Sequence, residues 1–190
     1  MTFPTRYELP QVLVDRIIDR ALEEDLSAGD ITTEACIDVE RSAVAHAVAR
    51  TNMVVAGGPV FCRVFERVET AGRLKCTFHA MDGDRVSAGA RLWTVSGRAR
   101  SLLMAERVAL NLAQRMSGIA TATRAYVDAV PAGAKTRIVD TRKTTPGLRI
   151  LERYSVRAGG GTNHRDHLGA AILIKDNHIA ASGSISRAIK

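Results

Sequence analysis

The chain has 190 residues, of which 46% are hydrophobic, so it can form one domain or two small ones around a real core. Its net charge of +7 favours an anionic partner, which can be nucleic acid, a membrane surface or a small acidic substrate. The aromatic fraction of 4% weighs against stacking on single-stranded nucleic acid. No stretch approaches a membrane span of about 18 apolar residues. The start Met-Thr-Phe-Pro does not resemble a signal segment, so we expect a cytoplasmic protein.

The first half of the chain predicts a small α+β layer. Residues 10–26 have the apolar periodicity of an amphipathic helix, and we expect 30–33 to form a loop with a side-chain-to-backbone turn. Alternation over 42–50 predicts a half-buried strand, with Val44 and Val48 on one face. A helix is expected from Pro59 to about residue 71. Further strands are expected around 74–78 and 92–95, separated by a turn at 82–84.

The longest helical pattern covers 101–130, with an expected break at Ser117-Gly118. Arg107 and Arg115 fall on the same side of this helix, and their spacing alone indicates ordinary surface cations. The three cysteines, Cys36, Cys62 and Cys76, lack the spacing of a zinc site or a disulfide framework. We expect them to be buried, reduced thiols.

The segment from 140 to 179 carries the residues that indicate function. The apolar pair 138–139 predicts a buried strand that ends at Asp140, and 170–174 predicts a second strand that ends at Lys175. Between them lie a helix over 148–156 and a glycine run at 159–161. Parallel βα units present their chemistry at the carboxyl ends of the strands. Four cations occupy such positions: Arg142, Lys143, Arg165 and Lys175.

This cluster indicates a ligand with more than one negative group. An arginine offers a planar fork to a carboxylate or phosphate, whereas a lysine is a mobile point charge. Gathering these cations in a low-dielectric cavity without an anion is unfavourable. The glycine run lets the backbone approach a flat ligand, and we expect His164 to contact that ligand. His178 is open to two interpretations, as a ligand contact or as a residue that orients a loop.

The motifs together resemble one enzyme family. The runs DTRKTTPGLR at 140–149, GGGTNHR at 159–165 and LIKDNHI at 173–179 are similar to quinolinate phosphoribosyltransferase, as is GDITT at 29–33. The resemblance implies a pentosyltransferase of NAD biosynthesis that acts on quinolinate and phosphoribosyl pyrophosphate, releasing carbon dioxide and pyrophosphate. It also implies Mg²⁺ bound with the donor, and a homodimer, with a hexamer as an alternative.

The resemblance further implies the roles of individual residues. Lys143 is the catalytic candidate, lying between quinolinate and the donor, and Thr141 lines the same pocket. Arg107 would reach into the site of a neighbouring subunit. The quinolinate carboxylates would be held by Arg142, His164, Arg165 and Lys175. No metal ligands are implied.

Length separates this chain from a complete barrel. We expect an α+β N-terminal open sandwich domain over 1–106, followed by the first part of an α/β, TIM-like barrel over 107–190. A complete barrel takes about 200 residues or more, so the barrel is expected to be incomplete, truncated at its C-terminal side, and the chain alone inactive. Two alternatives are a molybdenum-transport-associated paralogue of the same fold and a basic, non-catalytic module that binds nucleic acid. The sequence favours a substrate pocket over nucleic-acid or membrane binding.

Overall fold

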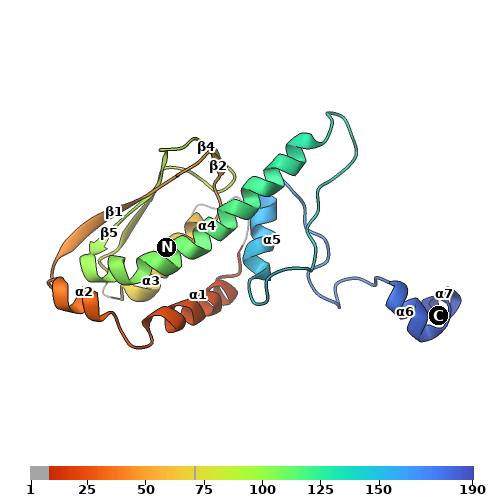
Figure 1. Ribbon diagram of the computed structural model, residues 1–190, viewed down its shortest axis with the longest axis horizontal. Coiled ribbons are helices and arrows are strands. Elements are labelled where there is room, and N and C mark those ends of the chain that lie inside the picture. Colours follow the sequence, from red (N-terminus) through yellow and green to blue (C-terminus); the bar gives the residue numbers. More distant parts are fainter. Residues whose placement is uncertain (1–8, 71) are drawn as a thin grey trace.

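The computed structural model describes residues 9–70 and 72–190 (Figure 1). The predicted helix end at residue 71 and the opening Met-Thr-Phe-Pro lie outside the described residues. The elements are α1 (Gln11–Leu26), α2 (Ile31–Cys36), β1 (Ser42–Val48), β2 (Met53–Val54), α3 (Gly58–Val68), β3 (Lys75–Phe78), β4 (Arg85–Val86), β5 (Arg91–Arg98), α4 (Ala99–Ala129), α5 (Arg149–Ala158), α6 (Asp176–Ser182) and α7 (Ile185–Ile189).

The central sheet is antiparallel, in the order β1-β5-β3, and β2 pairs separately with β4. Its buried face carries Trp93 and Val95, and the small Ala47 lies opposite Trp93. Val44 is 61% exposed, so the prediction that the valine face of β1 is buried was wrong. The reason is steric, because the bulky Trp93 needs a small cross-strand neighbour on the core side.

Helices α3 and α4 pack together against this sheet (Figure 1). The ring of Phe61 lies 4.8 Å from that of Trp93, centroid to centroid. A Cβ added to Gly58 would lie 2.8 Å from Trp93 Nε1, so only glycine allows this close approach. The N-terminus of α3 is held by the buried carboxylate of Asp82, which accepts hydrogen bonds from Gly57 N at 2.8 Å and Gly58 N at 3.0 Å.

Helix α4 runs unbroken from the sheet to α5 (Figure 1). The predicted break at Ser117-Gly118 was wrong, because Ser117 has a packing role within the helix. Its hydroxyl accepts from Ala56 N at 3.0 Å and donates to Ala56 O at 2.9 Å, which pairs both polar groups of a buried residue. The expected domain boundary at 106/107 falls within this helix.

The chain after α4 begins a parallel arrangement. Val139 and Thr162 form a parallel bridge, in which Asp140 N donates to Thr162 O at 3.1 Å and Thr162 N donates to Ile138 O at 2.9 Å. Helix α5 connects these two points and buries Leu151 and Tyr154. The Tyr154 hydroxyl donates to Asp82 Oδ2 at 2.6 Å, so α5 is tied directly to the sheet-containing part.

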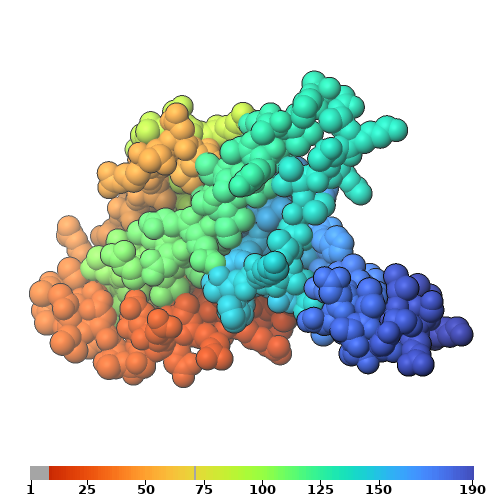
Figure 2. Space-filling model, turned by 45° about the vertical axis from the view of Figure 1, so that its right-hand side comes forward, coloured from red at the N-terminus to blue at the C-terminus, as the bar shows by residue number. Residues whose placement is uncertain are grey.

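The C-terminal region differs from the prediction. Residues 170–174 form no strand, and Ile172 is 93% exposed, because the described part of the chain offers this segment no neighbouring strand to pair with. Helices α6 and α7 pack on each other at one end of the molecule (Figures 1 and 2). Helix α7 begins after Ser184, whose Oγ accepts from Arg187 N at 3.2 Å.

The segment 30–33 forms the start of α2 rather than a loop. The expected side-chain-to-backbone bond exists, with Asp30 Oδ1 accepting from Thr33 N at 2.9 Å, but it caps a helix. The cysteines are all free thiols, although Cys36 is exposed rather than buried as expected. Within the described residues, no helix has the length and apolar character needed to cross a membrane.

Candidate functional site

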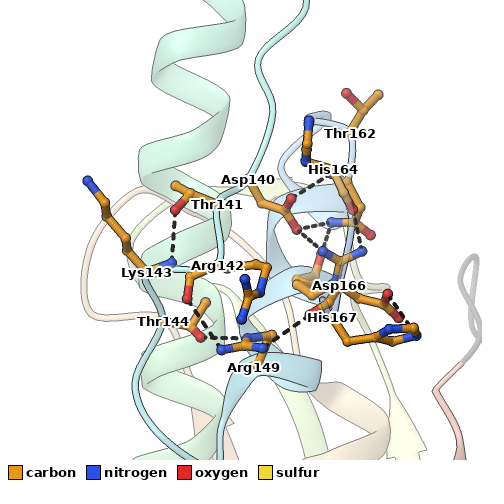
Figure 3. A network of polar contacts seen from close by, with 12 residues as sticks. Asp140, Thr141, Arg142, Lys143, Thr144, Arg149, Thr162, His164, Asp166 and His167 are labelled. Carbon is orange, nitrogen blue, oxygen red and sulfur yellow. Dashed lines mark hydrogen bonds and ion pairs between the residues drawn. The ribbon is translucent and has the colours of Figure 1, made fainter. Parts of the chain in front are cut away.

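A buried carboxylate joins the two segments that follow the parallel bridge. The Asp140 side chain is 5% exposed. Its Oδ1 accepts from His164 N at 2.6 Å, and its Oδ2 accepts from Asn163 Nδ2 at 2.7 Å (Figure 3). The loop that starts at Asp140 is therefore attached to the segment that follows Thr162.

Two arginines of α5, one turn apart, strengthen the same junction. Arg153 Nη2 donates to His164 O at 2.9 Å, and its Nη1 lies 3.1 Å from Asp140 Oδ2 as an ion pair. Arg149 donates through Nε to Thr144 Oγ1 at 2.9 Å and through Nη2 to Arg142 O at 3.3 Å. Its Nη1 reaches the carbonyl of residue 166, on the second segment, at 3.1 Å. All three guanidinium nitrogens of Arg149 therefore donate to protein oxygens, whereas Arg153 Nη1 faces Asp140 as an ion pair but makes no hydrogen bond among the described residues.

Arg142 differs from Arg149, whose three guanidinium nitrogens are all paired. It is half-buried, and its Nε is buried without a hydrogen-bond partner among the residues that the structure describes. Leaving a buried donor unpaired costs about 1–3 kcal/mol, and more for a charged group. Such an atom calls for an explanation, and an anionic ligand supplies one.

Lys143 and Thr141 lie on the other side of this loop. Thr141 Oγ1 accepts from Lys143 N at 2.9 Å, which fixes the turn between them. The Lys143 side chain is exposed and extends away from the Asp140 network (Figure 3).

A third arginine holds the far end of the loop. Arg115 of α4 donates through Nε to Glu152 Oε1 at 3.0 Å and also contacts Thr145 Oγ1. Burial raises the pKa of Glu152, but the hydrogen bonds from Arg115 and Thr145 outweigh it, so the pKa lies below its usual value. The sequence indicated only a surface cation at Arg115, whereas it clamps α4, α5 and the loop together.

The glycine run has a packing function. A Cβ at Gly159 would lie 2.7 Å from Thr123 Cβ, and one at Gly161 would lie 2.9 Å from Thr123 Cγ2. Gly160 has a φ of +90°, which side-chain-bearing residues rarely adopt. These glycines let the end of α5 pass closely against α4, which is a different reason from the ligand approach that we expected.

Arg165 and Lys175 lie on the connection to α6. Arg165 Nη1 donates to Ala171 O at 2.6 Å, and its side chain borders a hollow of about 580 Å³ that His178 and exposed apolar residues also line. Lys175 N donates to His178 Nδ1 at 2.9 Å. The His178 ring therefore caps the N-terminus of α6, while the Lys175 side chain is exposed.

Arg107 lies on the exposed side of α4, nearer its beginning. It borders a hollow of about 400 Å³ together with Asp25, Gly29 and Asp30. At 1.5 Å per residue it is about 12 Å along the helix axis from Arg115. Among the described residues, no group of three or more His, Cys, Asp or Glu side chains could hold a metal ion.

The structure thus gathers part of the predicted set. Arg142, His164 and Thr141 surround the Asp140 junction, whereas Arg107 lies elsewhere on α4. The residues that build the junction, Asp140, Arg149, Arg153 and Asn163, were not predicted as site residues. The spacing of Arg149 and Arg153 was an available signal, because residues four apart share one face of a helix.

Comparisons with known proteins agree with these motifs. The model for the quinolinate phosphoribosyl transferase N-terminal domain matches residues 30–117, and that for the C-terminal domain of the same family matches residues 119–190. The chain belongs to the quinolinate phosphoribosyltransferase family. The two family models meet in the middle of α4.

The relatives of this chain are longer than it is. It is 44% identical to a probable carboxylating nicotinate-nucleotide pyrophosphorylase from Synechocystis, covering 95% of this chain and 60% of that protein. It is 49% identical to the corresponding enzyme of Mycobacterium leprae, covering 91% of this chain and 61% of that protein. The chain therefore spans about three-fifths of the length of these curated relatives.

Solved structures confirm the predicted fold class for this family member. NadC from Streptococcus pyogenes superposes with a TM-score of 0.89 at 43% identity, covering 96% of this chain and 64% of that one. The nicotinate-nucleotide pyrophosphorylase from Francisella tularensis gives a TM-score of 0.88 at 36% identity, covering 99% and 65%. The antiparallel sheet with its helices is followed by the beginning of the barrel.

Proposed function

We propose that the protein serves phosphoribosyl transfer from phosphoribosyl pyrophosphate to quinolinate, giving nicotinate mononucleotide, carbon dioxide and pyrophosphate in NAD biosynthesis. The observation that carries this proposal is the buried Nε of Arg142, which has no hydrogen-bond partner among the described residues, beside Arg149, whose three guanidinium nitrogens all donate to protein oxygens. Arg153 Nη1 is also buried without a hydrogen bond, but it lies 3.1 Å from Asp140 Oδ2, so the protein itself supplies its counter-ion. We infer that the counter-ion of Arg142 is an external anion. The family membership supports quinolinate, a flat ring with two adjacent carboxylates, as that anion.

The proposed chemistry assigns separate tasks to the cations. Arg142, with His164, Arg165 and Lys175, binds the carboxylates and orients the ring nitrogen toward the ribose carbon of the donor. A bond forms between that nitrogen and that carbon while the bond to pyrophosphate breaks, and Lys143 stabilises the charge that gathers on the departing oxygens. The positively charged ring then stabilises the electron pair left on the ring carbon when the adjacent carboxylate leaves as carbon dioxide, and a proton from solvent bonds to that carbon to give the product.

Other parts of the proposal concern partners. Mg²⁺ is expected to arrive with the pyrophosphate of the donor, because this ion keeps most of its water and prefers phosphate oxygens. Arg107 is exposed on α4, as a residue that completes the site of a second subunit in a homodimer must be. A cytoplasmic location is supported by three cysteines that are all free thiols.

Titration calorimetry with quinolinate tests the proposal. The protein should bind quinolinate saturably and about tenfold or more tighter than nicotinate, because nicotinate lacks one carboxylate and thus one charged hydrogen bond of about 1.5–3 kcal/mol. Arg142→Gln should weaken quinolinate binding by a similar factor. The matched control is Arg91→Gln, at the exposed start of β5, which should leave the affinity unchanged.

Two results would contradict the proposal. One is equal affinity of the wild-type protein for quinolinate and nicotinate, which would remove the role of the second carboxylate. The other is binding of duplex DNA that falls steeply with salt in the absence of any quinolinate binding, as expected for a module that contacts phosphate backbones.

A further inference from the structure

The Asp140 junction, formed by Asp140, Arg153, Asn163 and His164, places several hydrogen-bond donors around one carboxylate. His164 N, Asn163 Nδ2 and the Arg153 guanidinium all face this carboxylate, at 2.6, 2.7 and 3.1 Å. The Arg153 side chain is 16% exposed, so both charges of the pair are largely removed from water. A carboxylate is acceptor-only and has about four lone-pair sites, so it can satisfy such a set, whereas an amide offers one oxygen.

The same contacts fix the backbone on both sides of His164. Its N–H is held by Asp140, and its carbonyl accepts from Arg153 Nη2 at 2.9 Å. On the opposite segment, the carbonyl of Arg142 accepts from Arg149 at 3.3 Å. Helix α5 therefore fixes the distance between the two segments, because Arg149 holds the 140–143 segment and Arg153 holds the 162–165 segment.

We propose that Asp140 is a positioning residue, whose buried carboxylate locks the 162–165 segment against the 140–143 segment and so sets the spacing of His164 and Arg165 relative to Arg142. The inference rests on the proposed function, since the spacing matters for a ligand with two carboxylates. Asp140 does not touch that ligand itself. A displacement of about 1 Å in a group that positions a substrate can lower the reaction rate by about 100-fold. A junction that holds these segments rigidly therefore matters for the function of the site.

Asp140→Asn is the direct test, because it keeps the shape and removes the charge. Whichever way the new amide faces, its NH₂ group meets a donor, from either His164 or Asn163, and Arg153 loses its counter-ion. The affinity for quinolinate should fall by about tenfold or more. Asp19→Asn is the matched control, since it removes a carboxylate that pairs with Arg67 between α1 and α3, and it should not change the affinity.

A reciprocal exchange separates positioning from general stability. In Asp140→Asn with Asn163→Asp, the amide at 140 can accept from His164 N and donate to the carboxylate at 163, although the exchange also removes the 3.0 Å hydrogen bond from Asn163 Nδ2 to Arg153 O, so the rescue is partial. The double variant should bind quinolinate tighter than Asp140→Asn alone. Arg153→Lys is a second probe, because it keeps the charge but cannot span Asp140 and the His164 carbonyl together, and it should also weaken binding.

The backbone amide of His164 gives a readout that needs no ligand. In ¹H–¹⁵N spectra of the free wild-type protein, its proton should be shifted downfield and protected from exchange, and both features should be lost in Asp140→Asn. An unchanged His164 amide, or quinolinate binding within about twofold of wild type in Asp140→Asn, overturns the positioning role. If wild type binds no quinolinate, the proposed function fails, and the amide comparison still decides whether Asp140 holds this segment.

Discussion

The hydroxyl of Tyr154 provides the sharpest stability test of how the two parts of the chain are joined. Tyr154 is fully buried on α5, and it donates to Asp82 Oδ2 at 2.6 Å. The same carboxylate also accepts from the amides of Gly57 and Gly58 at the start of α3. Tyr154→Phe removes this one donor without creating a cavity, so its effect isolates a single charged hydrogen bond.

The expected loss follows from the chemistry of that bond. A hydrogen bond to a charged group contributes about 1.5–3 kcal/mol, and here both partners are shielded from water. We expect Tyr154→Phe to lower the free energy of unfolding by about 2 kcal/mol. For a chain of about this length the melting temperature changes by about 2–4 °C per kcal/mol, so it should fall by roughly 4–8 °C.

Urea unfolding followed by the fluorescence of Trp93 measures this change. Trp93 is the chain's single tryptophan, and it is 2% exposed next to α3, so it reports directly on the core that Asp82 supports. The control is Tyr126→Phe, because Tyr126 is 68% exposed and should shift stability by less than about 0.5 kcal/mol. A Tyr154→Phe protein as stable as this control would refute the idea that Asp82 and Tyr154 bind the two parts together.

Two further predictions concern residues that α4 contacts, the ion pair of Arg115 with Glu152 and the hydrogen bonds of Ser117 with Ala56. Because the folded-state pKa of Glu152 lies below its ordinary value of 4.5, its ion pair with Arg115 adds stability above that pH and loses it as the pH falls further. Glu152→Gln should therefore unfold with a free energy about 1 kcal/mol lower than wild type at pH 7, a modest loss because Arg115 is partly exposed and solvent screens the ion pair. In urea titrations, the difference in the free energy of unfolding between this variant and wild type should disappear as the pH falls below 4.5. Ser117→Ala should cost about 1–3 kcal/mol, because it leaves both polar groups of Ala56 unpaired, whereas Ser42→Ala at an exposed strand end should cost nearly nothing.

Local patterns in the sequence predicted the elements whose stability comes from their own apolar face. Helices α1, α3 and α5 were predicted from periodicity, and the strands β1 and β5 were predicted from alternation. The pattern did not show which face of β1 is buried, because that depends on Trp93, a residue far away in the sequence. Ser117 likewise resembles a helix break, and only its contact with Ala56 explains why it lies inside a continuous helix.

The candidate site was predictable in part for a similar reason. The motifs predicted which cations belong to a ligand site, and the comparisons confirm the family that those motifs indicate. They did not distinguish a cation that binds an external anion from one that holds the protein together. Arg142 and Arg149 are alike as sequence letters, yet Arg149 is occupied by Thr144 and two carbonyls, whereas Arg142 keeps a buried nitrogen unpaired.

The Nε–H proton of Arg142 offers the most direct test of the account. Its ¹H–¹⁵N signal can be followed by NMR while quinolinate is added, with Arg142→Lys used to assign it. The account predicts that the Nε–H signal moves downfield and exchanges more slowly with water as quinolinate saturates the protein. Saturation with quinolinate that leaves this signal unmoved would show that the buried guanidinium is not the anchor for the ligand.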